Sequence, residues 1–239
     1  MAIDTRSKNR DQSWTPAWVE TRRHTTLVKG AHASLVCGVV AAPLFIGVAL
    51  IEGVTRQGFD LVRLPLSLLS VGDGGLVQVA NFIVTGLLVV MCALGMWRVL
   101  HPGPGGTWGP RLVGVFGLGL IAAGVFSPDP AFGFPPGTAQ GVPSGAQSWH
   151  SQLHGIAFDV AFLALIVNCF VFVRRFAILR QRGWAAYCAA TGVVLPTLIV
   201  LGFANMAIIG LLFLAAGAIA VAWLASIAAN LMSSDTGGQ

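Results

Sequence analysis

Residues 184–231 read WAAYCAATGVVLPTLIVLGFANMAIIGLLFLAAGAIAVAWLASIAANL, and this stretch contains no Asp, Glu, Lys or Arg. A helix rises 1.5 Å per residue, so roughly 20 residues cross a hydrocarbon core of ~30 Å, and the stretch is too long for one crossing. Asn205 lies near its middle and is a natural tip for a tight hairpin. The stretch therefore predicts two membrane helices, over residues 184–204 and 208–231.

The rest of the chain is also rich in apolar residues and poor in charged ones. Of its 239 residues, 55% are hydrophobic and only 10% are charged, whereas soluble domains carry about 25% charged residues. This excludes a soluble globular protein, and so much apolar surface also excludes a disordered one. Four more apolar stretches are long enough to span, over residues 33–54, 75–99, 110–126 and 150–173. We expect an all-α polytopic membrane bundle of six transmembrane helices.

Basic residues predict the orientation of this bundle. Twelve of the 14 lie before the first span or in the loops after the second and fourth spans, and only Arg56 and Arg63 lie on the other side. By the positive-inside rule both termini are cytoplasmic. The prediction is a multi-pass protein of the plasma (inner) membrane. It comprises a basic cytoplasmic tail (1–32), the six-helix domain (33–231) and a disordered cytoplasmic tail (232–239). The net charge of +5 reflects this topology and does not indicate nucleic-acid binding.

Two loops on the outer side, about 55–74 and 127–149, are apolar enough to fold back on the helices as a cap, because irregular backbone cannot face lipid. In the first loop, Arg63, Ser67 and Ser70 are spaced i, i+4 and i+7, which predicts one polar face of a short helix. Arg56 and Asp60 are four residues apart and could pair. We expect these five side chains to belong to an outer ligand-binding cluster.

The second span adds a polar stripe to the same outer half. Gln78, Asn81 and Thr85 lie on one helix face. Uncharged polar side chains in membranes commonly form hydrogen bonds between helices, and this reading is favoured two to one over a ligand-lining role. Asn81 is nevertheless included in the candidate ligand-binding cluster.

A histidine pair opens the fourth span. His150 and His154 are four apart and share a helix face, so they could bind one metal ion such as zinc, with Asp129 or Asp60 as a third ligand. The same four residues are the candidates for catalysis. The motif lacks the glutamate of the zincin helix, so histidines with purely structural hydrogen bonds are the favoured alternative, and no cofactor is certain.

Asp159 is a carboxylate inside the hydrocarbon layer, about 13 Å along the helix from His150. Such a residue is either functional or protonated and hydrogen-bonded to a neighbouring helix. At ~100° per residue it lies opposite His150 and about 140° from His154, which places it on a different contact surface.

The order Arg63-x-Pro65-Leu66-Ser67-x-Leu69-Ser70-x-Gly72, then Asn81, Phe126-x-x-Asp129-Pro130 and the histidine pair resembles bacterial and archaeal membrane proteins of the domain-of-unknown-function 998 family. The resemblance covers about residues 33–231 and implies six helices, an outer polar cluster and no established activity. A weaker likeness is to the ceramidase-type hydrolases, which hold zinc with histidines. This chain departs from them in having six spans rather than seven and no third histidine.

Two functions are compatible with these patterns. The first is a membrane protein that binds a lipid, a small hydrophobic ligand, or a membrane partner or second copy through its outer cap. The alternative is a metal-dependent membrane enzyme, a lipid hydrolase or cyclase. There Asp129, His150 and His154 would hold the metal or act as acid and base, and Arg56 and Arg63 would bind an anionic head group. The first is favoured because it needs only hydrogen-bonding roles.

Overall fold

A computed structural model describes residues 17–141 and 146–236 of the chain. Within them lie six long helices and one short 3₁₀ helix: α1 (Ala17–Thr55), η1 (Leu66–Ser70), α2 (Gly75–Leu100), α3 (Trp108–Val125), α4 (Trp149–Ile178), α5 (Arg182–Ala204) and α6 (Ile209–Thr236). Each of the six α-helices contains a segment long and apolar enough to cross a membrane. The predicted all-α, six-helix membrane fold is confirmed, and no strand occurs in the described ranges.

The first and last helices extend past the predicted ends of the six-helix domain. α1 begins at Ala17 rather than near residue 33, and α6 continues to Thr236 rather than ending near residue 231. Residues 1–16 and 237–239 of the two predicted tails lie outside the described residues.

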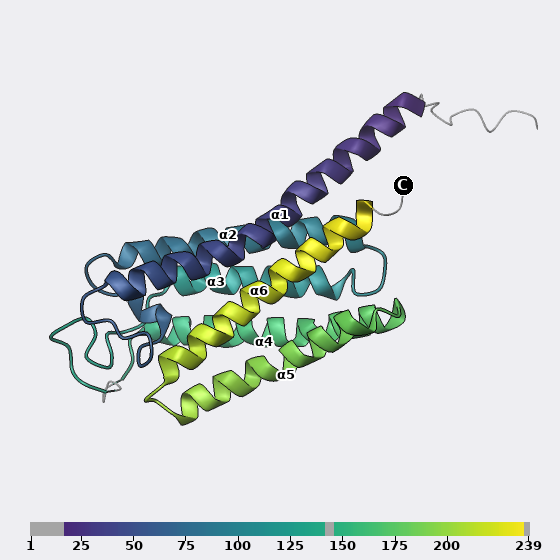
Figure 1. The fold of residues 1–239 in the computed structure, drawn as a ribbon. Helices are drawn as coiled ribbons and strands as arrows, with labels where there is room; N and C mark the ends of the chain where they lie inside the picture. The colour runs from purple at the N-terminus through teal and green to yellow at the C-terminus, as the bar shows by residue number, and fades with distance from the viewer. Residues whose placement is uncertain (1–16, 142–145, 237–239) are drawn as a thin grey trace, which may run out of the picture.

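The helices form a closed ring in chain order. Each helix packs against the next, and α1 closes the ring by packing against α6. Neighbours run in opposite directions, so α1 begins and α6 finishes at the same end of the bundle, called here the termini end (Figure 1). The opposite end, the loop end, carries residues 56–74, 126–141, 146–148 and 205–208.

Glycines set how closely the second and third helices approach. A Cβ atom built at Gly86 of α2 would lie 2.6 Å from the backbone oxygen of Gly117 in α3. Lipid tails are as apolar as the helices, so close backbone contact is a main source of helix association in membranes. The spacing of α2 and α3 therefore depends on the missing side chain of Gly86.

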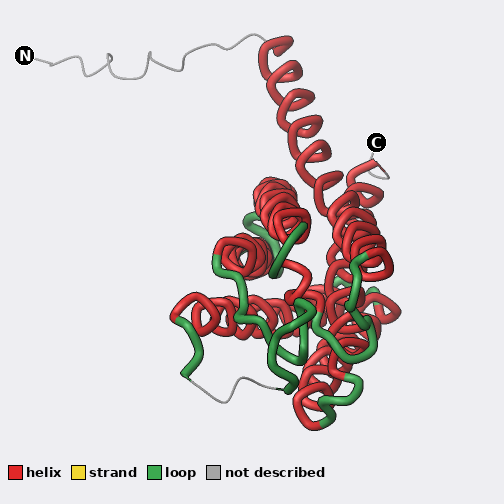
Figure 2. Tube along the Cα trace, turned by 90° about the vertical axis from the view of Figure 1, so that its left-hand side faces the viewer, coloured by secondary structure: helices red, strands yellow, loops and turns green. Residues whose placement is uncertain are grey.

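The two long loops form a cap with a small core of its own at the loop end. Leu64 and Leu68 from the first loop pack with Ala131 and Phe134 from the second, and the ring of Phe59 meets Phe134 edge-on at 5.2 Å. In Figure 2, which views the loop end, the loops lie across the helix ends. The predicted cap is confirmed, because apolar loop residues find partners in each other and on the bundle.

The hairpin predicted at Asn205 is also present. α5 ends at Ala204, and the Asn205 side-chain oxygen accepts a hydrogen bond from the backbone N–H of Ala207 at 3.2 Å. This asparagine turn reverses the chain into α6.

Candidate functional site

A cavity of about 400 Å³ lies under the cap, within the ring of helices. Helices α3, α4 and α6 contribute several residues each, α1, α2 and α5 contribute one phenylalanine each, and both cap loops form its roof. The lining is mostly apolar and includes eight phenylalanines: Phe45, Phe82, Phe116, Phe132, Phe158, Phe162, Phe203 and Phe213. Such a volume and lining are typical of small-molecule sites.

A small number of polar side chains interrupt this apolar wall. Three of them are titratable, Asp129, His154 and Asp159, and the uncharged ones are Ser67, Gln147 and Ser151. A few polar groups in an apolar cavity fix the orientation of a bound molecule.

His154 is buried, with 8% of its surface exposed, and is held by the end of α3. Its Nδ1 lies 3.1 Å from the Ala123 oxygen and 2.8 Å from the Phe126 oxygen. A carbonyl only accepts hydrogen bonds, so Nδ1 carries the proton and donates it. The neutral ring then presents Nε2 as an acceptor, and no described residue bonds to that atom.

Asp129 is placed by the start of α4. Its Oδ2 accepts a hydrogen bond from the backbone N–H of Ser148 at 2.8 Å, and Ser148 is the N-cap of the helix. Hydrogen bonds from the Ser148 hydroxyl and N–H hold the pKa of Asp129 below its ordinary value, with a smaller contribution from the nearby His150. Asp129 is therefore a carboxylate at neutral pH.

Asp159 lines the same cavity as His154, so the expected separate contact surface is wrong. The lining residues of α4 run from Ser151 to Phe162. At ~100° per residue they cover an arc of about 160°, with His154 and Asp159 near its two edges. The predicted angle of about 140° between His154 and Asp159 is correct, but the cavity wall covers an arc of α4 wide enough to include both residues.

The cavity opens between α4 and the α5–α6 hairpin. Four exposed lining residues come from these two parts of the chain: Gly155, Asp159, Phe203 and Met206. Gln147, at the end of the second cap loop, is also exposed. In Figure 1, α4 and α5 lie together at the termini end and diverge toward the loop end. We call this opening the mouth.

Phenylalanines stack beside the mouth. Phe158 of α4 stacks on Phe213 of α6 with ring centroids 5.3 Å apart, and Phe203 of α5 meets Phe213 edge-on at 5.2 Å. These contacts join the hairpin to α4 around the opening.

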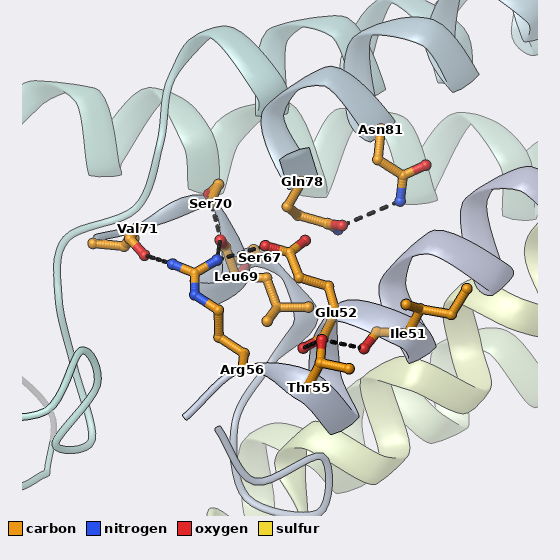
Figure 3. Close-up of polar contacts among 10 residues, drawn as sticks. All are labelled: Ile51, Glu52, Thr55, Arg56, Ser67, Leu69, Ser70, Val71, Gln78 and Asn81. Carbon is orange, nitrogen blue, oxygen red and sulfur yellow. Dashed lines mark hydrogen bonds and ion pairs between the residues drawn. The ribbon is translucent and has the colours of Figure 1, made fainter. Parts of the chain in front are cut away.

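Arg56 lies outside the cavity and fastens the cap to α1 (Figure 3). Its guanidinium pairs with Glu52 and donates hydrogen bonds to the backbone oxygens of Leu69, at 3.1 Å, and Val71, at 2.6 Å. The expected pairing of Arg56 with Asp60 is wrong. α1 ends at Thr55, so the two are not one helical turn apart, and Asp60 instead accepts a hydrogen bond from the N–H of Val62.

The expected polar face of Arg63, Ser67 and Ser70 is also not formed. The short helix is a 3₁₀ turn that begins after Pro65, so Arg63 precedes it and is exposed. Ser70 is buried and donates to the backbone oxygen of Ser67. Of these three residues, Ser67 alone lines the cavity.

Asn81 forms hydrogen bonds between helices, which is the interpretation favoured above for the polar stripe on α2. Its Nδ2 donates to the Phe45 oxygen of α1 and to the side-chain oxygen of Gln78, both at 3.1 Å, as Figure 3 shows in part. Thr85 donates to the Asn81 oxygen at 3.5 Å. The stripe joins α1 to α2 and does not line the cavity.

The two histidines lie in different environments. His150 is exposed and stacks on Trp149 with ring centroids 3.5 Å apart, while His154 is buried against α3. Among the residues that the structure describes, no three His, Cys, Asp or Glu side chains lie close enough to hold a metal ion. The triad of His150, His154 and Asp129 is thus not assembled here.

Sequence reasoning placed Ser67, Asp129 and His154 among the candidate residues, and all three line the cavity. It missed Gln147 and Ser151, and it set Asp159 apart. Ser151 lies three residues before His154, so the helical period was a signal that could have identified it. The phenylalanines had no such signal, because apolar residues face lipid, core and cavity alike.

Comparison with known proteins gives one result. The family model described as "Protein of unknown function (DUF998)" matches residues 39–230, which include α2 to α5, both cap loops and most of the first and sixth membrane spans. No curated protein and no solved structure matches the chain. Because the match covers most of the chain, as the order of residues from Arg63 to the histidine pair indicated, this multi-pass membrane protein belongs to the DUF998 family of proteins of unknown function.

Proposed function

We propose that this protein binds a single-chain amphiphilic molecule of the membrane in the cavity under its cap. The loop end faces away from the cytosol, because the basic residues lie mostly at the termini end. Membrane lipids are then the source of the ligand, and the outer leaflet supplies it.

The observation that carries this proposal is the composition of the cavity wall. An apolar cavity of about 400 Å³ is within the range of ligand sites and is bounded by aromatic rings, with polar groups gathered on α4 and the second cap loop. A molecule with an apolar chain and one polar group matches both parts of this wall.

The depth of the mouth favours entry from the membrane. Asp159, at its rim, lies ten residues after Trp149, the first residue of α4. This distance corresponds to about 15 Å along the helix, so the opening reaches the hydrocarbon layer rather than only the water above it. A ligand can therefore pass sideways between α4 and the α5–α6 hairpin without leaving the bilayer.

Filling the cavity tests this proposal. A Cβ at Gly155 would meet no atom within 4 Å, so Gly155→Leu adds bulk at the cavity wall without a clash at Cβ. Gly47→Leu is the matched control, because Gly47 has equally open surroundings on α1 and does not line the cavity. Both changes replace a helical glycine and favour the helix by about 1 kcal/mol, so both proteins should fold.

The measurement is binding of tritiated 1-dodecanol to the protein in nanodiscs of zwitterionic lipid, with empty nanodiscs subtracted. We expect Gly155→Leu to reduce saturable binding about tenfold, since it occupies the chain site. Gly47→Leu should bind as the wild type does. Equal binding by all three proteins would show that the alcohol does not use the cavity and would overturn the proposal.

A further inference from the structure

The ionisable side chains of the cavity wall are mostly acidic. Asp129 and Asp159 are carboxylic acids, and among the residues that the structure describes His154 is the one basic side chain and no Lys or Arg lines the cavity. The two arginines of the cap are not available to it. Arg56 is engaged by Glu52 and two backbone oxygens, and Arg63 is exposed on the cap surface.

Two of the three groups have an accepting atom to which no described residue bonds. Asp129 accepts hydrogen bonds from the N–H and the hydroxyl of Ser148, whereas Asp159 makes no hydrogen bond or ion pair with any described residue. His154 is more than nine-tenths buried and lines the cavity with its Nε2 unbonded, while its proton on Nδ1 is committed to α3. The wall thus offers acceptors to a ligand and has no cationic donor for an anionic group.

An unpaired carboxylate at the depth of Asp159 is costly in a membrane and calls for a cationic partner. The surrounding phenyl rings favour the same kind of partner, because an aromatic face attracts a cation through its quadrupole. Phe158 and Phe162, on the same helix as Asp159, both line the cavity.

We propose that the cavity selects amphiphiles with a cationic, ammonium-type head group, held by Asp159 on α4 and by the phenylalanine rings beside it. This inference rests on the proposed function and names its ligand class. Lipids with only an anionic head group are excluded, since their charge would face the Asp159 carboxylate without a compensating arginine.

The test compares three probes with the same twelve-carbon chain in the same nanodiscs: dodecyltrimethylammonium, 1-dodecanol and dodecyl sulfate. The ammonium probe carries a permanent charge, so its protonation does not vary. We expect it to bind about tenfold more tightly than the alcohol, and the sulfate to bind more weakly than the alcohol.

Charge-neutralising variants locate the effect. Asp159→Asn should lower affinity for the ammonium probe about tenfold and leave the alcohol unchanged, because the carboxylate acts on charge alone. Asp129→Asn is the second variant and should lower it much less, because Asp129 lies at the start of α4, about 16 Å along the helix from Asp159. Asp73→Asn is the matched control, since Asp73 is exposed on the cap and does not line the cavity, and it should change nothing.

The outcomes separate the two proposals. If the alcohol and the ammonium probe bind equally and both respond to Gly155→Leu, the cavity binds amphiphiles and the head-group preference is overturned. Tighter binding of the sulfate, or an equal loss in Asp73→Asn and Asp159→Asn, also overturns it. If no probe responds to Gly155→Leu, the proposed function fails as well.

Discussion

Arg56 shows how one side chain can hold a membrane protein's cap in place. It lies one residue beyond the end of α1, yet its guanidinium reaches the backbone oxygens on either side of Ser70 and stands over the Phe134 ring at 5.6 Å. Its partner Glu52 is buried in the last turns of α1, with 8% of its side chain exposed. The five donors of arginine suit this position, because they bind a carboxylate and backbone oxygens together.

Removing the Arg56 charge should therefore unfold the cap. Arg56→Met leaves Glu52 buried without a counter-charge, and breaking such a pair costs about 3–5 kcal/mol. We expect a correspondingly lower free energy of unfolding, measured by denaturant titration of the detergent-solubilised protein.

Two further variants complete this experiment. Replacing both partners, Glu52→Gln with Arg56→Met, should recover part of the loss, because no buried charge remains. Arg63→Met is the control, since Arg63 is exposed and surface substitutions usually stay within about 0.5 kcal/mol. An equal effect of Arg56→Met and Arg63→Met would contradict the assigned role.

At the scale of the element, contacts between helices depend on small residues facing each other. Gly86 of α2 meets Gly117 of α3 backbone to backbone, and Gly119 of α3 lies against the methyl group of Ala161 in α4. The second contact borders the cavity, because both of its residues line the wall. The ring of helices is therefore closely packed on the side of α3, opposite the mouth.

A methyl group at Gly86 should separate α2 from α3. Gly86→Ala would place Cβ 2.6 Å from the Gly117 oxygen, and overpacking of this kind costs about 1–3 kcal/mol. Gly114→Ala on α3 is the matched control, because its Cβ would lie 3.9 Å from Ala93, an ordinary contact. We expect a lower melting temperature in detergent for Gly86→Ala and an equal or higher one for Gly114→Ala. A rise for both variants would contradict the close contact.

The arrangement of the whole molecule separates its two ends by chemistry. The termini end carries most of the basic residues, and the loop end carries the cap and the cavity. With six helices in alternating directions, the start of α1 and the end of α6 lie at the same end of the bundle (Figure 1). The distribution of basic residues predicts that this end faces the cytosol.

Labelling of intact cells checks this orientation. A cysteine at Gly141, exposed on the second cap loop, should react with an impermeant thiol reagent added outside the cells. A cysteine at Ser234, exposed near the end of α6, should react only after lysis, and the wild type corrects for the four native cysteines. The reverse pattern would place the cavity on the cytosolic side.

Much of the fold follows from composition and spacing. The six spans, the turn at Asn205 and the folding of both apolar loops into a cap were predicted without coordinates. Each has a local cause, because a bilayer requires a helix wherever about 20 apolar residues occur in a row, and irregular backbone must be covered.

The candidate site was predicted less completely, and the failures share a cause. The Arg56–Asp60 pair assumed that the helix continues past Thr55, where α1 in fact ends. The face of Arg63, Ser67 and Ser70 assumed an α-helical period in a 3₁₀ turn. Both errors concern a few residues at a helix boundary, where local spacing is a weak guide.

The amino-acid sequence alone determined the number of helices and the existence of an ionisable group within the membrane, since hydropathy and chain order require no partner. Tertiary structure decided that Asp129, His154 and Asp159 face one cavity and that Arg56 does not. A helical angle states where a side chain points around its own axis, but the divergence of α4 from α5 and α6 determines whether it meets protein, lipid or open space. That divergence arises from packing between distant segments and is not encoded in any single span.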